Sequence, residues 1–265
     1  MPSPPKISFQ DVEVVFPTRG KSTVALQGFT LDIRPEGFTC IVGQSGCGKT
    51  TALNLVAGFI KPSSGRVLID GCEITGPGAD RTVVFQADSV FPWMTVRQNV
   101  EYGPAVRGID PGARRRVADQ LIAMVGLAGF ENHFPRELSG GMKKRVDLAR
   151  AYANDPKVLL MDEPFGALDV MTRDRMHLDL LRLYDEHRKC ILFVTHDIEE
   201  ALFLADRVVV MTARPARVRA ILDAPFPRPR NPAIKTGPEL QTLRRDTMAL
   251  LGKSGEPELV EEGVP

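Results

Sequence analysis

The sequence has few cysteines and no long apolar segment. Its 265 residues include four cysteines (Cys40, Cys47, Cys72 and Cys190), and no two of them form a CxxC pair. This spacing predicts reduced intracellular thiols, with neither a zinc site nor a disulfide framework. No apolar run approaches the roughly 20 residues that span a bilayer, and the start, MPSPPKISFQ, lacks the apolar core of a signal peptide. We therefore expect a soluble, cytoplasmic chain, which a separate protein would have to hold at any membrane where it acts.

The chain also lacks an excess of charge of either sign. Its 34 basic and 33 acidic residues leave a net charge of +1. Proteins that bind nucleic acid usually carry a clustered basic excess, and a face that holds anionic lipid needs one too. We therefore expect no nucleic-acid partner. The hydrophobic share of 43% is that of an ordinary globular protein with one large or two small domains.

Strand and helix patterns alternate along most of the chain. Segments 6–16 and 23–35 alternate polar and apolar residues and predict two antiparallel-looking strands, which precede a buried strand at 38–43 and a helix at 49–60. Further strands are predicted at 65–70, 81–86, 157–163, 190–196 and 207–213, with helices at 169–187 and 197–206, and 217–224 continues the alternation. The pattern predicts an α/β fold with a mostly parallel sheet and helices on both faces.

Two regions depart from this alternation. From about Thr95 to Asn154 the patterns are helical, which predicts an inserted helical subdomain of about residues 92–155. After 224, PFPRPRNP (225–232) predicts an extended linker, 238–252 a short helix, and 253–265 a frayed end. The predicted division is therefore a main domain, 1–224, and a C-terminal segment, 225–265, too small for a typical folded regulatory domain.

A phosphate-binding loop is predicted at GQSGCGKT, residues 43–50. Gly43, Gly48, Lys49 and Thr50 fit the pattern GxxxxGK[ST] between a strand and a helix. The glycines let the backbone wrap a phosphate, Lys49 would reach the β- and γ-phosphates, and the Thr50 hydroxyl would bind magnesium. The predicted nucleotide-binding residues here are Gly43, Gln44, Ser45, Gly46, Cys47, Gly48, Lys49, Thr50 and Thr51. Alone, the loop indicates a nucleotide and nothing more specific.

Three polar side chains follow buried strands, where ligands bind in open α/β sheets. Asp162 and Glu163 come after the apolar run VLLM. Asp162 would hold magnesium directly or through water, and Glu163 would orient and deprotonate an attacking water. His196 ends the strand in FVTHD and would hydrogen-bond a γ-phosphate or water. A lone histidine is more often structural, so this role stays open.

A second turn suited to anions lies in LSGGMKKR, residues 138–145. Ser139, Gly140 and Gly141 precede a helix predicted from Met142 to about Asn154. A helix start offers free N–H groups and favours negative charge, although a plain helix N-cap would use the same residues. One chain thus carries two turns suited to phosphate.

Together these motifs resemble the ATP-binding-cassette family, the nucleotide-binding subunits of ABC transporters. The resemblance covers about residues 6–224, and LSGG is its discriminating motif because many other phosphate-loop proteins lack it. It implies a P-loop NTPase cassette with a RecA-like, mostly parallel sheet core, an antiparallel β-subdomain and a helical subdomain. The matching motifs are, in order, the phosphate loop, Gln86, LSGG, Asp162 with Glu163, Asp169 and His196.

The resemblance also gives the second turn a role. In the family, two subunits bind two ATP molecules head to tail, each lying on the phosphate loop of one subunit and under the LSGG helix of the other. Ser139, Gly140 and Gly141 would therefore clamp the γ-phosphate on a second copy of the chain, and Asp169 would make contacts across the same interface. Loss of that phosphate would release the clamp, so hydrolysis would open the pair.

Other roles implied by the resemblance concern aromatic residues and Gln86. Phe16 would stack on adenine, although an aromatic residue at a strand end is often part of a core. Gln86 would sense magnesium or the attacking water. Phe91, Pro92 and Trp93 would be exposed and would grip a short cytoplasmic helix of a membrane permease, an interface that aromatic anchors suit. The alternative is that they form the core of the helical insert.

The signature helix departs from the common family pattern. Met142 replaces the usual glutamine and, with FPW after Gln86, resembles the nitrate/sulfonate/taurine importer branch. Lys143 and Lys144 stand where a basic residue and a glutamine are usual. Lysines on a helix generally occupy its solvated face, and the sequence does not decide whether Lys144 meets nucleotide or solvent.

The resemblance implies an active ATPase that uses ATP and Mg²⁺ and lies peripherally on the cytoplasmic face of the inner membrane. Its partners would be a second copy, the permease and, indirectly, an external solute-binding protein, and the solute would be a small anion such as nitrate, a sulfonate or taurine. Two alternatives are a soluble cassette ATPase of repair, translation or cluster assembly, and a degenerate cassette that binds ATP as a scaffold. A soluble cassette ATPase of that kind usually has long inserts, a second cassette or a basic surface, whereas this chain has one cassette, no long insert and a net charge of +1. Intact Lys49, Glu163 and His196 argue against the scaffold.

Overall fold

The structure, a computed structural model, describes residues 4–18 and 20–252. It forms two compact units, one of residues 1–78 and 189–265 and one of residues 79–188. The frayed end predicted at 253–265 lies outside the described residues. Within the described residues, no helix combines the length and apolar character needed to cross a bilayer.

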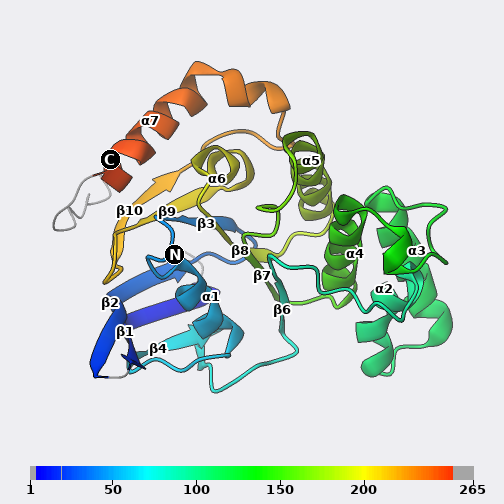
Figure 1. Ribbon diagram of the computed structural model, residues 1–265, viewed down its shortest axis with the longest axis horizontal. Coiled ribbons are helices and arrows are strands. Elements are labelled where there is room, and N and C mark those ends of the chain that lie inside the picture. The colour runs from blue at the N-terminus through cyan, green and yellow to red at the C-terminus, as the bar shows by residue number, and fades with distance from the viewer. Residues whose placement is uncertain (1–3, 19, 253–265) are drawn as a thin grey trace. The chain divides into compact units, whose positions relative to one another are not determined.

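The first unit contains an antiparallel sheet at its N-terminal end (Figure 1). Strand β1 (Ile7–Thr18) lies between β2 (Lys21–Ile33) and β4 (Ser64–Ile69), and the short β5 (Cys72–Glu73) pairs with β4. The polar–apolar alternation places Phe9 and Phe29 on the buried face, where their rings meet edge to face at 5.1 Å. The predicted pair of antiparallel strands is confirmed.

Four strands of the first unit form a second, mostly parallel layer. Strand β3 (Phe38–Val42) pairs in parallel with β8 (Cys190–Thr195) on one side and β9 (Arg207–Met211) on the other, and β10 (Val218–Asp223) is antiparallel to β9. Every residue of β3 and β8 is buried, as expected of parallel strands covered on both faces. The fold class predicted from the alternation is thus observed.

Helices pack on these strands. Helix α1 (Lys49–Ala57) contacts β2, β4 and β8, and α6 (Ile198–Leu204) packs on β3, β8 and β9. The proline-rich segment runs without helix to Asn231, and a 3₁₀ turn (Pro232–Thr236) then leads into α7 (Pro238–Gly252), which lies against α6 and β9 (Figure 1). The short C-terminal helix is where the sequence predicted it.

The second unit combines two parallel strands with a helical cluster. Strand β6 (Arg81–Val84) pairs with β7 (Val158–Asp162), and between them in the chain lie α2 (Val96–Val106), α3 (Pro111–Met124), a 3₁₀ turn (Pro135–Glu137) and α4 (Gly140–Ala153). The three α-helices pack on one another, and α5 (Val170–Glu186) contacts α3 and α4. The helical patterns predicted from about Thr95 to Asn154 are thus observed as helices.

Capping residues set the helix limits more tightly than periodicity could. Helix α4 begins at Gly140, two residues before its predicted start, because the Ser139 hydroxyl accepts the N–H of Met142 at 3.3 Å. Helix α1 ends at Ala57, three residues before its predicted end, because Gly58 takes a left-handed conformation with φ +78°.

Gly58 should tolerate no side chain. Alanine there would adopt an unfavourable left-handed backbone, and its methyl would overlap the Gly76 carbonyl. We expect Gly58→Ala to lower the free energy of unfolding by about 3 kcal/mol, which combines roughly 1–2 kcal/mol of backbone cost with overpacking. Gly71 has a similar φ of +75°, but a methyl there would meet no described atom within 4 Å. Gly71→Ala is therefore the control, and urea unfolding followed by circular dichroism should show for it only the backbone part of the loss. Equal losses for the two variants would contradict the overlap.

Candidate active site

The phosphate loop connects β3 to α1 and is shaped by its glycines. A Cβ at Gly43 would lie 2.7 Å from the Cys47 sulfur and 3.3 Å from the Cβ of Met211, so only glycine fits. Gly46 and Gly48 have φ values of +73° and +129°, which favour glycine. Cys47 is buried beneath the turn, and burial raises the pKa of its thiol. The loop is therefore preformed.

Two cations hold the carbonyl groups of this loop. The side chain of Lys49 is only 4% exposed, and its ammonium donates to the carbonyls of Gly43 at 3.0 Å and Gln44 at 3.2 Å. Arg214, in the turn after β9, donates to the Gly46 carbonyl at 2.5 Å. Sequence reasoning missed Arg214, because nothing in the segment TARPAR shows that the turn returns to the phosphate loop.

Strand register brings His196 to the same edge of the sheet. Val42, which precedes the loop, is opposite Thr195 in the parallel pair β3–β8, so the loop and His196 leave neighbouring strands at their carboxyl ends. His196 is exposed, and the next residue, Asp197, caps α6. This is the edge at which ligands bind in α/β sheets.

Phe16 is distant from the phosphate loop in the sequence, but strand pairing brings it close to the loop. It is 40% exposed, close to the end of β1, and pairs with Thr23 of β2. Two residues further along β2, the Ala25 carbonyl lies 3.1 Å from the position of a Cβ on Gly48. Its exposure argues against the alternative that Phe16 is a core residue.

In the second unit, parallel pairing places Gln86 and the acidic pair at one edge. Val84 is opposite Met161, so Gln86, two residues after β6, is at the same edge as Asp162, the last residue of β7, and Glu163, which follows it. A Cβ on Gly166 would be 3.5 Å from the Gln86 amide nitrogen and 4.0 Å from a Glu163 carboxylate oxygen, so both side chains converge on that glycine. Glu163 also has a positive φ of 43°, a conformation that costs about 1–3 kcal/mol and is concentrated at functional sites.

The two glycines of the LSGG turn have different surroundings within the second unit. A Cβ on Gly141 would be 2.6 Å from the Thr172 methyl of α5, whereas one on Gly140 would meet no described atom within 4 Å. Packing with α5 thus accounts for Gly141, and the space beside Gly140 is open.

Asp169, at the start of α5, lies on the same side of this helix as the contact between Thr172 and Gly141. Its carboxylate caps the helix by accepting the N–H of Thr172 at 3.0 Å, and this hydrogen bond lowers the pKa of Asp169. The next two residues, Val170 and Met171, are 69% and 70% exposed. Sequence reasoning did not single them out, although an apolar pair directly after a helix cap was the available signal.

Lys144 does not occupy a solvated helix face, so the usual reading of a helical lysine is wrong here. It is 2% exposed, and its ammonium donates to the carbonyls of Phe85 at 3.0 Å and Gln86 at 3.2 Å. The Lys144 ammonium is therefore buried against the backbone of the segment that contains Gln86.

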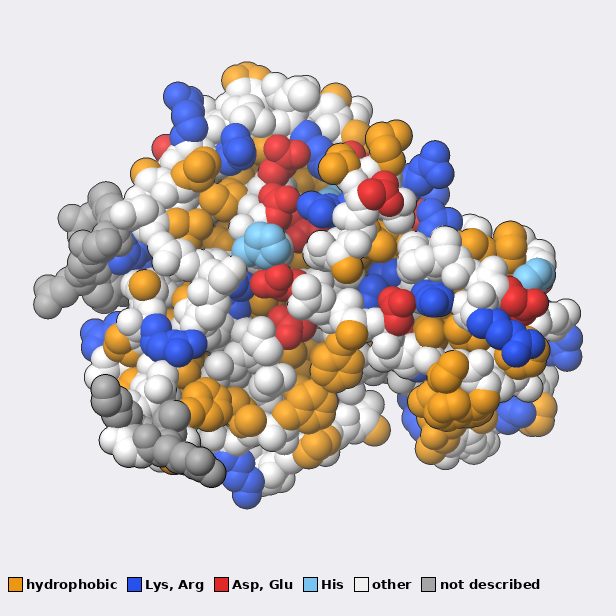
Figure 2. Space-filling view, viewed as in Figure 1, with side chains coloured by type: hydrophobic (Ala, Val, Ile, Leu, Met, Phe, Trp, Pro, Cys, Tyr) orange, Lys and Arg blue, Asp and Glu red, His pale blue; other side chains and the backbone are white. Residues whose placement is uncertain are grey.

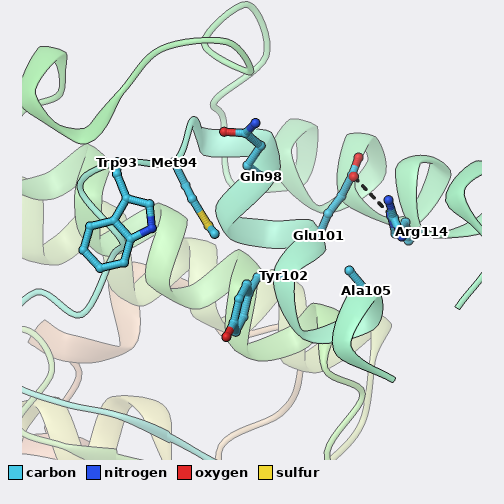
Figure 3. A pocket seen from close by; sticks show the side chains of 7 residues that line it. All are labelled: Trp93, Met94, Gln98, Glu101, Tyr102, Ala105 and Arg114. Atoms are coloured by element: carbon cyan, nitrogen blue, oxygen red, sulfur yellow. Dashed lines mark hydrogen bonds and ion pairs between the residues drawn. The ribbon is translucent and has the colours of Figure 1, made fainter. Parts of the chain in front are cut away.

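Apolar side chains gather over α2 on the surface of the second unit (Figure 2). Trp93 is 68% exposed and Pro92 is exposed as well. Phe91 is half-buried against Tyr102, with ring centroids 4.7 Å apart, so its expected exposure is only partly observed. Beside them is a groove of about 370 Å³, with the ion pair of Glu101 and Arg114 (3.4 Å) at one end (Figure 3). Its lining residues are Trp93, Met94, Gln98, Glu101, Tyr102, Ala105 and Arg114.

The donors predicted for magnesium are oxygen atoms of a hydroxyl, a carboxamide and a carboxylate, from Thr50, Gln86 and Asp162. Hard divalent cations prefer this chemistry, and magnesium is usually held by few protein ligands together with phosphate. Among the described residues, no group of three or more His, Cys, Asp or Glu side chains could hold a metal without other donors. The three oxygen donors themselves fit an ion that is bound together with a nucleotide.

Comparison with known proteins agrees with this geometry. Residues 26–166 match the family described as ABC transporter. The nitrate import ATP-binding protein NrtD of Synechocystis sp. is 46% identical over 251 residues, which cover 92% of this chain and 94% of that protein. The taurine import ATP-binding protein TauB of Roseobacter denitrificans is 47% identical over 207 residues, covering 78% and 77%.

Solved structures show the same fold. The dimeric structure of a bacterial ABC transporter cassette is 31% identical with a TM-score of 0.72, covering 83% of this chain and 99% of that one. The cbiO1 protein of Clostridium perfringens, part of an ABC transporter complex, is 27% identical with a TM-score of 0.76, covering 93% and 96%. The chain therefore belongs to the ABC transporter family, as an ATP-binding subunit with ATPase activity.

Proposed function

We propose that this chain powers the import of a small anion and that it works as a head-to-tail pair of identical subunits. The observation that carries the proposal is the open space beside Gly140, at the start of α4. The other glycine of this turn, Gly141, packs against Thr172 of the same chain. A helix start that is left open offers N–H groups and a favourable dipole to an external phosphate. The solved dimer of a related cassette supports pairing.

Within one chain, the phosphate loop would bind the ATP phosphates and Phe16 would stack on adenine. The Lys49 ammonium would exchange the carbonyls of Gly43 and Gln44 for phosphate oxygens, which are stronger partners because they carry charge. Bound Mg²⁺ neutralises charge on the phosphates, and its ligands from the chain would be the oxygens of Thr50, Gln86 and Asp162.

Hydrolysis would then need a base and an orienting group. Glu163 would accept a proton from the attacking water, and Gln86, which converges with it above Gly166, would orient that water. His196 would donate a hydrogen bond to the γ-phosphate from the carboxyl end of β8.

The second copy would complete each site. Ser139, Gly140 and Gly141 of one chain would clamp the γ-phosphate that lies on the phosphate loop of the other, and Asp169 would contact the partner across the same interface. The exposed Val170 and Met171 would add apolar contact there. Release of the phosphate after hydrolysis would remove the clamp and let the pair separate.

Transport requires partners that the chain itself does not supply. The groove beside Trp93 would receive a short helix of a membrane permease, which would hold the chain peripherally on the cytoplasmic face of the inner membrane. A solute-binding protein outside would act through that permease, and no step requires nucleic acid. The nitrate and taurine importers among the relatives support a small anionic solute such as nitrate, taurine or another sulfonate.

We further propose that residues 1–224 form the cassette, with the helical subdomain at about 92–155, and that 225–265 form an appended linker, helix and tail.

The test is the mass of Glu163→Gln by light scattering, with and without Mg-ATP, because this variant should bind ATP without hydrolysing it. We expect ATP to convert a monomer into a dimer. Adding Ser139→Arg should abolish the dimer, because the larger, charged side chain would block the turn. Adding Glu186→Arg, which puts the same charge on an exposed site at the end of α5, should leave it intact. A monomer at saturating ATP would count against pairing by the chain alone.

A further inference from the structure

A buried polar network joins α4 to the chain segment that contains Gln86. The Lys144 ammonium donates to three successive carbonyls: Phe85 at 3.0 Å, Gln86 at 3.2 Å and Ala87 at 3.4 Å. An ammonium has three N–H donors, so one side chain serves the whole turn. Asp88, at 3.8 Å, lies within ion-pair distance of the same nitrogen.

The residue after Asp88, Ser89, is held by side chains from the next turns of α4. Asp147, 2% exposed, accepts hydrogen bonds from the backbone N–H of Ser89 at 3.1 Å and from its hydroxyl at 2.9 Å. Arg150 donates to the Ser89 carbonyl at 2.6 Å and to Asp147 at 3.1 Å. Lys144 and Asp147 form an ion pair at 3.6 Å, so charges of both signs are compensated within the network.

The spacing explains how one helix can do this. Lys144, Asp147 and Arg150 are three residues apart and therefore share one face of α4. That face meets residues 85–89, whereas the start of the same helix is the LSGG turn. Gln86 is exposed, so its backbone is held from the inner side while its side chain extends toward Gly166.

Lys144 makes more hydrogen bonds than could be made by the glutamine that is usual at this position in the family. A glutamine amide is shorter, has two N–H donors and carries no charge. It could not serve three carbonyls and also compensate Asp147. A buried ammonium is costly unless it is fully hydrogen-bonded and paired, and here it is both.

We propose that Lys144 is a positioning residue for Gln86. Its ammonium fixes the backbone of residues 85–87 to the signature helix, so that Gln86 and the LSGG turn move as one body. A displacement of the LSGG turn on the partner's nucleotide is thereby transmitted to the residue that orients water in the chain's own site. The functional part of this inference rests on the pairing of two copies and on the role of Gln86, both proposed above.

The first experiment measures backbone exchange and needs no activity. Hydrogen exchange of the nucleotide-free protein is compared for wild type, Lys144→Met and the control Lys143→Met, which removes a charge from the adjacent residue of the helix. We expect Lys144→Met to speed exchange of the Ser89 amide, whose N–H donates to Asp147 at 3.1 Å, by about tenfold or more, because the segment loses the charge-assisted bonds that hold its carbonyls. Exchange in β7 should not change, and the control should match wild type.

The second experiment is a kinetic cycle with Gln86→Ala. We expect Lys144→Met to lower kcat about tenfold with KM for Mg-ATP within about twofold, and to have less than about a twofold further effect when Gln86 is already alanine. Lys144→Gln, which keeps two donors, should recover part of the lost kcat.

Either of two results would overturn the proposal: unchanged or uniformly faster exchange in Lys144→Met, or an equal loss of kcat in both backgrounds. If Gln86→Ala itself leaves kcat unchanged, the proposed role of Gln86 is overturned instead, and the exchange result alone decides whether Lys144 holds the segment.

Discussion

Lys49→Met is expected to lower kcat/KM for Mg-ATP by about a thousandfold. Removal of one preorganised electrostatic group typically costs a hundred- to a thousandfold, and Lys49 is the buried cation inside the loop that binds the phosphates. Methionine preserves most of the apolar stem and removes the ammonium, while the Arg214 hydrogen bond and the close packing at Gly43 remain to hold the shape of the loop. Equilibrium binding of a fluorescent ATP analogue and steady-state turnover would measure the two parts of the loss.

Lys61→Met provides the matched control, because Lys61 is an exposed lysine shortly after α1. It should retain both binding and turnover. Binding by Lys49→Met within about tenfold of wild type would contradict the role of this ammonium.

Glu163→Gln is expected to lower kcat by about a hundred- to ten-thousandfold while ATP affinity stays within about threefold. The amide occupies the same space beside Gln86 and Gly166 but cannot accept a proton from water. Its backbone would keep the positive φ at the same cost, so the fold should not relax. Single-turnover hydrolysis of radiolabelled ATP would separate the chemical step from product release.

Glu186→Gln, at an exposed position on α5, removes a carboxylate of the same kind and should leave turnover unchanged. If Glu163→Gln retains kcat within about tenfold of wild type, another group must accept the proton.

Much of the fold follows from local patterns in the sequence. Apolar runs such as FTCIV and CILFVT identified the buried parallel strands, and the pattern of 238–252 identified α7. The errors are concentrated at helix ends, where single side chains decide. Periodicity cannot show that the Ser139 hydroxyl caps α4 two residues early, or that Gly58 ends α1.

The candidate site divides in the same way. The phosphate loop and the acidic pair at the end of β7 are contiguous motifs, so sequence alone identifies them. Arg214 and Lys144 are different, because each acts on a carbonyl that is distant in the chain. Backbone carbonyls are present at every residue, so only the folded chain shows which of them meet a cation.

The two compact units differ in how their pieces are ordered along the chain, and this sets an order for folding during synthesis. The second unit is one continuous segment, 79–188, so all of its strands and helices are available once the ribosome has passed it. Strand β3 instead has both of its partners, β8 and β9, after residue 189. Domains generally fold as units during synthesis, and pairing between distant segments is slow. The phosphate loop, which is anchored on β3, therefore acquires its final support only when the last third of the chain has emerged, so a nascent chain has a folded signature helix before it has a supported nucleotide site.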